Sequence, residues 1–224
     1  MNCKWKYLSY LMHPEAPAYG GSQAFFDEPD KQMDKGDSCN TRIWRMSNHM
    51  GTHIDFPRHF SIKGKVLNDY PADFWFFNRI DIIFTYPVEP GKILSTKDLN
   101  LNTVPADVEL LLIKTGFCDL REDPVYWQSN PGLHPELATS LRKNFPRLKV
   151  IGFDFISLSS FVHRELGRNA HKAFLDTSNP ILLLEDMDMN EINESVKILQ
   201  AVIAPLRVKY SDAAPCTVLA EVEI

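Results

Sequence analysis

Residues 49–60, HMGTHIDFPRHF, gather side chains that bind metal ions or transfer protons. The chain has seven histidines in 224 residues, and His49, His53 and His59 all fall in this stretch, together with Asp55. Two or three imidazoles and one carboxylate form the ligand set of a catalytic metal site with an open coordination position. Nitrogen and oxygen donors suit Zn, Mn or Fe(II) better than Cu(I) or an iron–sulfur cluster. The stretch therefore predicts a metal site.

The spacing of these groups favours an extended segment. Gly51 and Pro57 argue against a regular helix. In an extended chain every second side chain shares a face, so the odd-numbered residues from 49 to 59 are predicted to lie on one side. Gly51 leaves space for close approach, and Pro57 ends regular pairing, which lets His59 turn in from a loop. A single His–Asp pair is more often an ordinary hydrogen bond, but four such groups on one face favour metal binding.

This stretch resembles the His-x-Gly-Thr-His-x-Asp-x-Pro-x-His signature of the cyclase family of metal-dependent hydrolases, and every fixed position matches. The family includes bacterial kynurenine formamidases and isatin hydrolases. The resemblance covers nearly the whole chain, and residues 27–38, an expected exposed hairpin or loop, fit it least. It implies one α/β domain over residues 1–224, with a swivelling β/β/α layout and a distorted, barrel-like mixed sheet. It also implies a homodimer or a higher homo-oligomer.

Apolar and aromatic runs between turn residues predict the elements that position the signature. Strands are expected at residues 4–12, 41–48, 79–86, 107–115, 148–154 and 216–224. Helices are expected from Pro135, at 162–176, and as a short stretch from Ser95 to Leu99. Residues 190–204 fit an amphipathic helix, whereas the resemblance implies a strand from Val196 to Val208.

A second group of candidate ligands lies late in the chain. His163 and His171 share the expected helix but lie about 12 Å apart along its axis, so at most one reaches the ion. Spacing alone does not choose between them. The resemblance implies His171, followed by an apolar strand that ends in Glu185. A lone buried carboxylate costs on the order of several kcal/mol, which a metal would offset. The alternative for Glu185 is a salt bridge at the strand end.

Other positions have two interpretations each. By the resemblance Tyr19 belongs to the substrate loop, where formamidases often carry Trp, and the alternative is an ordinary loop aromatic. Asp154 either orients a metal ligand or satisfies loop amides. Phe56 stands where the family mostly has a small residue, so its ring narrows the pocket or packs behind it. The aromatic residues 74–77 are interpreted as core or interface rather than as a wall of the pocket.

Composition excludes several classes of function. The net charge is −5 without a long basic run, which argues against nucleic acid or an anionic membrane as partner. The four cysteines form no Cys-x-x-Cys pair, so neither a disulfide framework nor a structural zinc site is predicted. A secretory leader and a long apolar span are both lacking, and a cytoplasmic location is expected.

The resemblance implies the ligand set His49, His53, Asp55, His171 and Glu185. Five ligands exceed the three protein ligands usual for one catalytic zinc, so one or two ions are expected, with Zn favoured and Mn as the alternative. An ion there would lower the pKa of bound water to about 7. His59, left free, would move the proton from water to the leaving nitrogen.

The predicted activity is hydrolysis of the amide C–N bond of a small molecule, an aryl formamide such as N-formylkynurenine from tryptophan catabolism. Isatin hydrolase, lactonase or cyclase activity at the same site is the alternative enzyme hypothesis. A metal-binding module without catalysis is the alternative from another class. A serine nucleophile elbow, a glycine-rich phosphate loop and a His-Glu-x-x-His motif are all absent from the sequence, and no further cofactor-binding motif is predicted.

Overall fold

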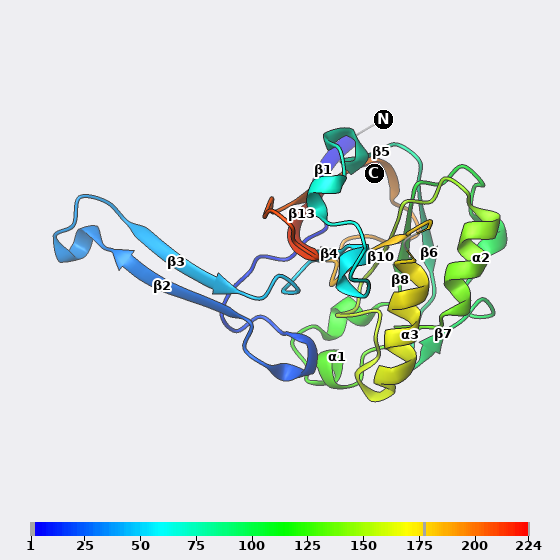
Figure 1. The fold of residues 1–224 in the computed structure, drawn as a ribbon, viewed down its shortest axis with the longest axis horizontal. Coiled ribbons are helices and arrows are strands. Elements are labelled where there is room, and N and C mark those ends of the chain that lie inside the picture. Colours follow the sequence, from blue (N-terminus) through cyan, green and yellow to red (C-terminus); the bar gives the residue numbers. More distant parts are fainter. Residues whose placement is uncertain (1–2, 177, 224) are drawn as a thin grey trace.

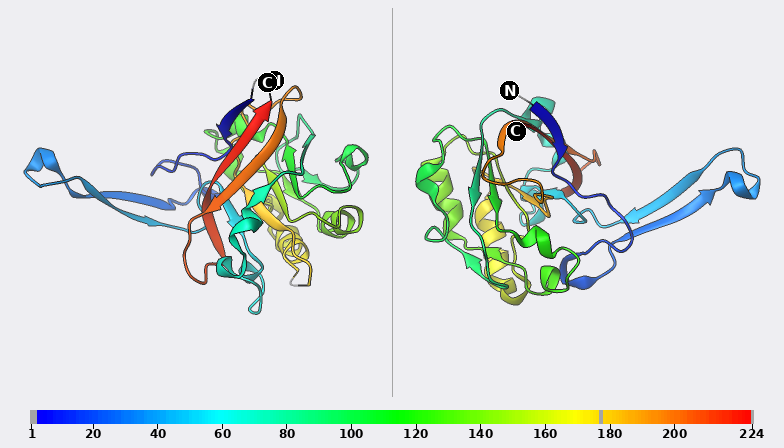
Figure 2. Two further views of the ribbon diagram at one scale, coloured as in Figure 1. Left: turned by 90° about the horizontal axis from the view of Figure 1, so that it is seen from above. Right: turned by 180° about the vertical axis from the view of Figure 1, so that it is seen from behind.

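A mixed sheet of nine strands organises the part of the chain that the computed structural model describes, residues 3–176 and 178–223 (Figure 1). Its spatial order is β5-β12-β13-β4-β11-β10-β8-β6, and β1 lies beside β13. The strands are β1 (Cys3–Tyr7), β4 (His53–Asp55), β5 (Phe76–Phe77), β6 (Ile80–Phe84), β8 (Leu110–Lys114), β10 (Val150–Phe153), β11 (Leu182–Glu185), β12 (Lys197–Pro205) and β13 (Ala213–Glu223). Because β12 also lies against β6, the sheet is nearly closed into a barrel, which confirms the predicted α/β class (Figure 2).

The parallel half of the sheet, β6, β8, β10 and β11, is the most apolar part of the fold. Strands buried on both faces read as continuous apolar runs, and β8 (Leu-Leu-Leu-Ile-Lys) is buried at every position. Helices α2 (Glu136–Asn144) and α3 (Arg164–Phe174) lie side by side against these strands, and α1 (Val125–Gln128) is a single turn (Figure 1). Leu137, Leu141 and Phe145 are buried, as the four-residue spacing of apolar residues predicted.

Two sequence-based expectations about elements were wrong or incomplete, and one open choice is resolved. No helix forms from Ser95 to Leu99, because the Asp98 carboxylate accepts hydrogen bonds from the Ser95 N–H (2.8 Å) and hydroxyl (2.7 Å) and closes a turn. Residues 197–205 form β12, which confirms the strand that the resemblance implied and excludes the alternative helix there. The first strand ends at Tyr7, and beyond it the Ser9 hydroxyl, instead of a backbone carbonyl, accepts the Val218 N–H.

A long hairpin of β2 (Phe25–Lys31) and β3 (Thr41–Met46) projects away from the body, as Figures 1 and 2 show. It confirms the exposed hairpin expected around residues 27–38. Ile43 and Trp44 are both more than half exposed on it. A smaller parallel pair joins β7 (Ile93–Leu94) to β9 (Gly132–Leu133).

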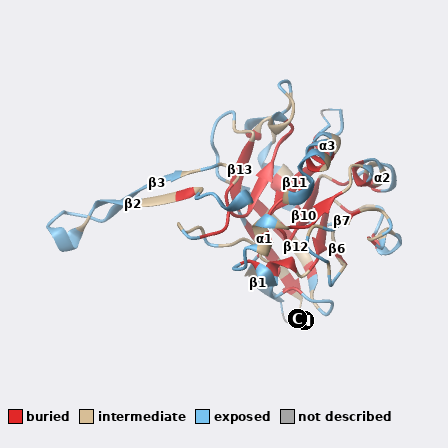
Figure 3. Ribbon diagram, turned by 90° about the horizontal axis from the view of Figure 1, so that it is seen from below, coloured by how far each residue is buried: buried red, intermediate tan, exposed pale blue. Residues whose placement is uncertain are grey.

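Burial is concentrated in the strands that surround β4, as Figure 3 shows. In the aromatic run 74–77, Trp75 and Phe77 are buried and Phe76 is 57% exposed. The run therefore lies partly in the core and partly on the surface of the protein. Near the ends of the chain, Cys3 pairs with Glu223 across β1 and β13. None of the helices in the described residues is long and apolar enough to cross a membrane.

We expect Leu111→Ala to lower the free energy of unfolding by about 2–5 kcal/mol, because Leu111 is fully buried in β8 and its loss leaves a cavity. The matched control is Leu11→Ala. Leu11 is 89% exposed, so this substitution makes the same chemical change at the surface. Denaturant unfolding of both variants checks this. Equal stability losses in the two proteins would contradict the assigned core.

Candidate metal centre

Strand β4 and the turns on either side of it place the four groups of the signature stretch. Only residues 53–55 are extended, so the expectation of one extended face from 49 to 59 was wrong. Gly51 has a φ of +62°, a conformation that glycine adopts without strain, and the turn there folds His49 back beside His53. Their ring centroids lie 5.2 Å apart. Pro57 begins a single 3-10 turn that carries His59 back toward the same point.

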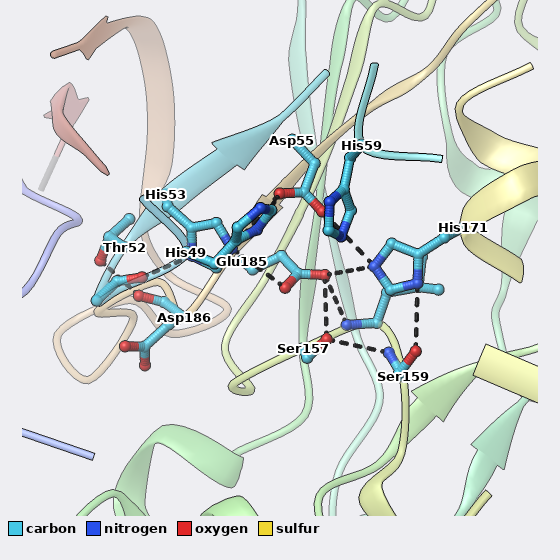
Figure 4. A network of polar contacts seen from close by, with 12 residues as sticks. His49, Thr52, His53, Asp55, His59, Ser157, Ser159, His171, Glu185 and Asp186 are labelled. Atoms are coloured by element: carbon cyan, nitrogen blue, oxygen red, sulfur yellow. Dashed lines mark hydrogen bonds and ion pairs between the residues drawn. The ribbon is translucent and has the colours of Figure 1, made fainter. Parts of the chain in front are cut away.

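The sheet brings a second carboxylate to β4. Because β4 lies between β11 and β13, Glu185 stands directly opposite His53 in the antiparallel ladder with β11. His53 and Asp55 are two residues apart on the strand and therefore share a face. His171 reaches this face from α3, as Figure 4 shows. The structure thus brings together all five residues predicted as ligands, and His163 lies outside the group, exposed at the start of α3.

Each carboxylate stands between two imidazoles at similar distances. His53 Nε2 lies 3.5 Å from Asp55 Oδ1 and 3.5 Å from Glu185 Oε2. His171 Nε2 lies 3.6 Å from Asp55 Oδ2 and 3.5 Å from Glu185 Oε1. His49 Nδ1 is closer, 3.0 Å from Asp55 Oδ1. Asp55 is fully buried and Glu185 is nearly so.

In the neutral rings of His53 and His171, the nitrogen that faces the carboxylates is an acceptor. His53 Nδ1 donates to the Gly51 carbonyl (2.8 Å) and His171 Nδ1 to the Gly167 carbonyl (3.0 Å), which leaves both Nε2 atoms with a lone pair. His53 Nε2 and both Asp55 oxygens have close neighbours, but among the described residues no contact of these atoms has the geometry of a hydrogen bond. Facing acceptors repel one another unless a cation lies between them. Gaps near 3.5 Å suit a divalent ion that bonds each atom at about 2.0–2.2 Å, so these residues fit the implied metal.

Backbone and hydroxyl groups hold the ligands in position. Glu185 Oε1 accepts the Leu158 N–H at 2.8 Å, and the Ser157 hydroxyl lies 3.5 Å from it (Figure 4). The Ser159 hydroxyl lies 3.2 Å from His171 Nδ1. Gly167 lets α3 approach this loop, since a Cβ at residue 167 would lie 2.6 Å from the Ser159 Cα. The ligand orientation therefore depends on a close contact between helix and loop.

The charges of the group shift its pKa values strongly in the absence of an ion. Burial alone lowers the pKa of His49, but the carboxylates of Asp55 and Asp212 raise it to about 9. Burial opposes the charged form of His171 as well, and Asp55 and Glu185 raise its pKa to about 10. Burial would raise the pKa of Asp55, yet the two histidines hold it well below its usual range. The arrangement stabilises a positive charge among the carboxylates.

Asp212 is a site residue that the sequence-based reasoning missed. Its Oδ2 lies 3.3 Å from His59 Nδ1 and 3.4 Å from His49 Nε2, and its Oδ1 accepts a 2.7 Å hydrogen bond from Asn48. Because Asp212 lies 153 residues beyond His59 in the sequence, local spacing could not have indicated it. Burial lowers the pKa of His59, which keeps its ring neutral near pH 7.

The metal centre forms the floor of a cavity of about 510 Å³. Tyr19, expected in the substrate loop, lines it, and its ring packs edge-on against Phe161 with centroids 5.4 Å apart. Phe60 and two arginines of α3, Arg164 and Arg168, also line it. The arginines were not predicted from the sequence.

Two expectations about the pocket are resolved by packing. Phe56 is fully buried and packs against Tyr70 and Trp75, with centroids 5.4 and 6.2 Å away, so it lies behind β4 and does not narrow the cavity. The run 74–77 does not line the cavity.

Asp154 accepts hydrogen bonds from the Thr115 and Gly116 N–H groups at 2.9 and 2.8 Å, which is the loop-amide role.

A buried ion pair fixes the turn after Glu185. Arg121 donates to both oxygens of Asp186 at 3.1 and 2.9 Å, and the Tyr126 hydroxyl donates to the same carboxylate at 2.6 Å. Asp186 has a positive φ of 52°, which is costly for a residue with a side chain. Thr52 of the signature donates its hydroxyl to the Asp186 carbonyl. Thr52 therefore joins the signature stretch to the end of β11.

Comparison with known proteins agrees with this arrangement. An uncharacterized protein of Methanocaldococcus jannaschii is 28% identical over 175 residues, 78% of this chain and 79% of that protein. A protein of Bacillus cereus named kynurenine formamidase is 27% identical over 213 residues, 95% of this chain and 94% of that protein. The solved structure of isatin hydrolase A from Labrenzia aggregata has a TM-score of 0.81 at 19% identity, covers 98% of this chain and 93% of its own, and supports the fold.

Residues 7–160, well over half of the chain, match the family described as "Putative cyclase". This range contains the whole signature stretch, and the strand, helix and turns described above bring the remaining ligand candidates to it. The chain therefore belongs to the cyclase family of metal-dependent hydrolases.

Proposed function

We propose that this chain hydrolyses the amide C–N bond of an aryl formamide, with a divalent metal ion held by His49, His53, Asp55, His171 and Glu185. The observation that carries the proposal is the set of buried carboxylate oxygens and imidazole Nε2 atoms that face each other at 3.5–3.6 Å on the floor of a cavity. When bound there, the ion polarises the substrate carbonyl and lowers the pKa of a coordinated water to about 7.

One or two ions are compatible with the ligand atoms. His53, Asp55 and Glu185 offer atoms within 4.8 Å of one another, and so do His49, Asp55 and His59. Asp55 belongs to both groups, so it would hold the metal whether one or two ions were bound. We propose Zn as the resident ion, with Mn as the alternative, because borderline cations suit mixed imidazole and carboxylate ligands.

His59 has the position of a proton carrier. In the neutral ring, the Nδ1–H of His59 donates a hydrogen bond to Asp212 Oδ2 at 3.3 Å, which leaves Nε2 with a free lone pair in the lining of the cavity. The lowered pKa of His59 makes it a neutral base near pH 7. It can therefore take a proton from water and pass it to the leaving nitrogen.

Aromatic walls support an aryl substrate. Tyr19, Phe60 and Phe161 line the cavity, and a volume near 510 Å³ is within the range of small-molecule sites. The Bacillus cereus relative named kynurenine formamidase is similar over almost its full length. These observations support N-formylkynurenine or a close relative as the substrate.

We expect wild-type protein purified with added Zn or Mn to carry bound metal, and His53→Ala to lower metal affinity by more than the roughly 10–100-fold typical of losing an outer contact. Elemental analysis after dialysis measures this. His163→Ala is the matched control, because His163 is exposed and lies outside the group. A wild-type protein that stays free of metal would refute the site.

His59→Ala should keep the metal and lose about 10²–10⁴ in kcat, the range for general acid–base catalysis. The same substitution at His134, which lies in the loop before α2, is the control. Loss of metal together with activity would assign His59 as a ligand, consistent with its place beside His49 and Asp55. Unchanged turnover would remove it from the mechanism.

For N-formylkynurenine we expect a kcat/KM above about 10⁴ M⁻¹s⁻¹ on the metal-loaded protein, the usual lower range for enzymes, and a higher value than for isatin. The measurement is a direct comparison of the two substrates, with a lactone as a third. A value below about 10² M⁻¹s⁻¹ for the formamide would mean that the natural substrate is another compound.

A further inference from the structure

Two arginines on α3 face the cavity without an anionic partner. Arg164 and Arg168 line the cavity and are exposed, and neither forms an ion pair with a carboxylate in residues 3–176 and 178–223. They are four residues apart, so their side chains are neighbours on one face of the helix. Two positive charges at this spacing repel one another, which is unfavourable for the helix unless an anion lies between them.

The arginines have a fixed relation to the metal centre. His171 is three residues beyond Arg168 and seven beyond Arg164, on the same side of α3. At 1.5 Å per residue the arginines lie about 4.5 and 10.5 Å from His171 along the axis. An anionic group held by them would therefore be separated from a carbonyl at the floor by the length of a few bonds.

An aromatic ring holds the Arg164 side chain in the lining of the cavity. The Arg164 guanidinium lies 3.9 Å from the centroid of the Phe161 ring, a cation–π contact. Phe161 in turn packs against Tyr19. Tyr19, Arg164 and Arg168 line the same cavity, and the positive charges of the two arginines oppose the rise that burial causes in the pKa of the Tyr19 hydroxyl. The guanidinium is thus placed before any ligand enters.

The positive charge of Arg164 and Arg168 is opposite in sign to the net charge of the protein and to the carboxylates of the cavity. The protein as a whole carries −5, and the floor of the cavity holds two carboxylates. The net charge of the protein repels an anionic group, whereas a divalent ion held at the floor would offset the charges of the two carboxylates there. Two arginines in the lining of the cavity offset the repulsion by the net charge locally, and a planar guanidinium binds a carboxylate with two parallel hydrogen bonds.

We propose that Arg164 and Arg168 select substrates that carry a carboxylate on the side chain of the aryl ring, away from the amide that is cleaved. The inference rests on the proposed function and adds a residue pair that sets specificity. The carboxylate lies at the rim against α3 and the amide at the floor against β4, so the two ends of the substrate are bound by different elements.

The test compares a formamide acid with its methyl ester, N-formylkynurenine and N-formylkynurenine methyl ester, on the metal-loaded protein. Wild type should prefer the acid. Arg168→Gln and Arg164→Gln should each reduce the acid-to-ester ratio of kcat/KM by about tenfold, because a hydrogen bond to a charged group is lost, and the change should appear in KM. Lysine at either position should restore part of the preference, since it keeps the charge but not the planar fork.

Arg147→Gln is the matched control, because it removes the same charge from an exposed arginine outside the cavity. Its acid-to-ester ratio should equal that of wild type. Unchanged ratios in Arg164→Gln, Arg168→Gln and the double variant, with hydrolysis intact, would overturn the proposal and leave the proposed function standing.

Failure of the proposed function gives a different result, namely no hydrolysis of either compound by wild type. Binding then decides the role of the arginines. Calorimetric titration with kynurenine and kynurenine methyl ester should show tighter binding of the acid to wild type, and that difference should vanish in the double variant. Equal affinities, no binding, or a preference for the acid that persists in the double variant would overturn the assignment.

Discussion

Burial of two carboxylates side by side is the constraint on which this structure depends. Asp55 and Glu185 are almost fully enclosed, and within the described residues no lysine or arginine forms an ion pair with either. Removing such charges from water is costly, so positive charge must come from elsewhere. The surrounding imidazoles can supply it as protons, which the raised pKa values of His49 and His171 express, or they can share a metal ion with the carboxylates.

The fold meets this constraint by bringing distant segments to one short strand. β4 has only three residues, yet it pairs with β11 on one edge and β13 on the other. One edge places Glu185 opposite His53, and the other ends beside Asp212, which faces His49 and His59. The close contact of α3 with the loop at Ser159 then adds His171.

The chemistry of the site was largely predictable, while its geometry was not. His49, His53, Asp55 and His59 lie close in sequence, so their types and spacing were enough to indicate metal and proton chemistry. The same spacing suggested one extended face, because a turn at Gly51 depends on a backbone conformation that side-chain patterns do not encode. The choice of His171 over His163 needed the resemblance, since helical periodicity treats the two alike. Arg164 and Arg168 resembled any exposed helix residues until the cavity beside them was known.

The position of β4 between β11 and β13 also has a consequence for the order in which the protein folds. His59 and Asp212 face each other across 153 residues of sequence, and both edges of β4 are paired only when the last described strand is in place. Contacts of such separation form slowly, because the entropy of closing a long loop must be lost before they stabilise anything. The five ligand candidates all precede β13 in the sequence, whereas the contact of Asp212 with His49 and His59 depends on the turn that leads into β13. The groups that surround the proposed ions therefore come from both halves of the chain.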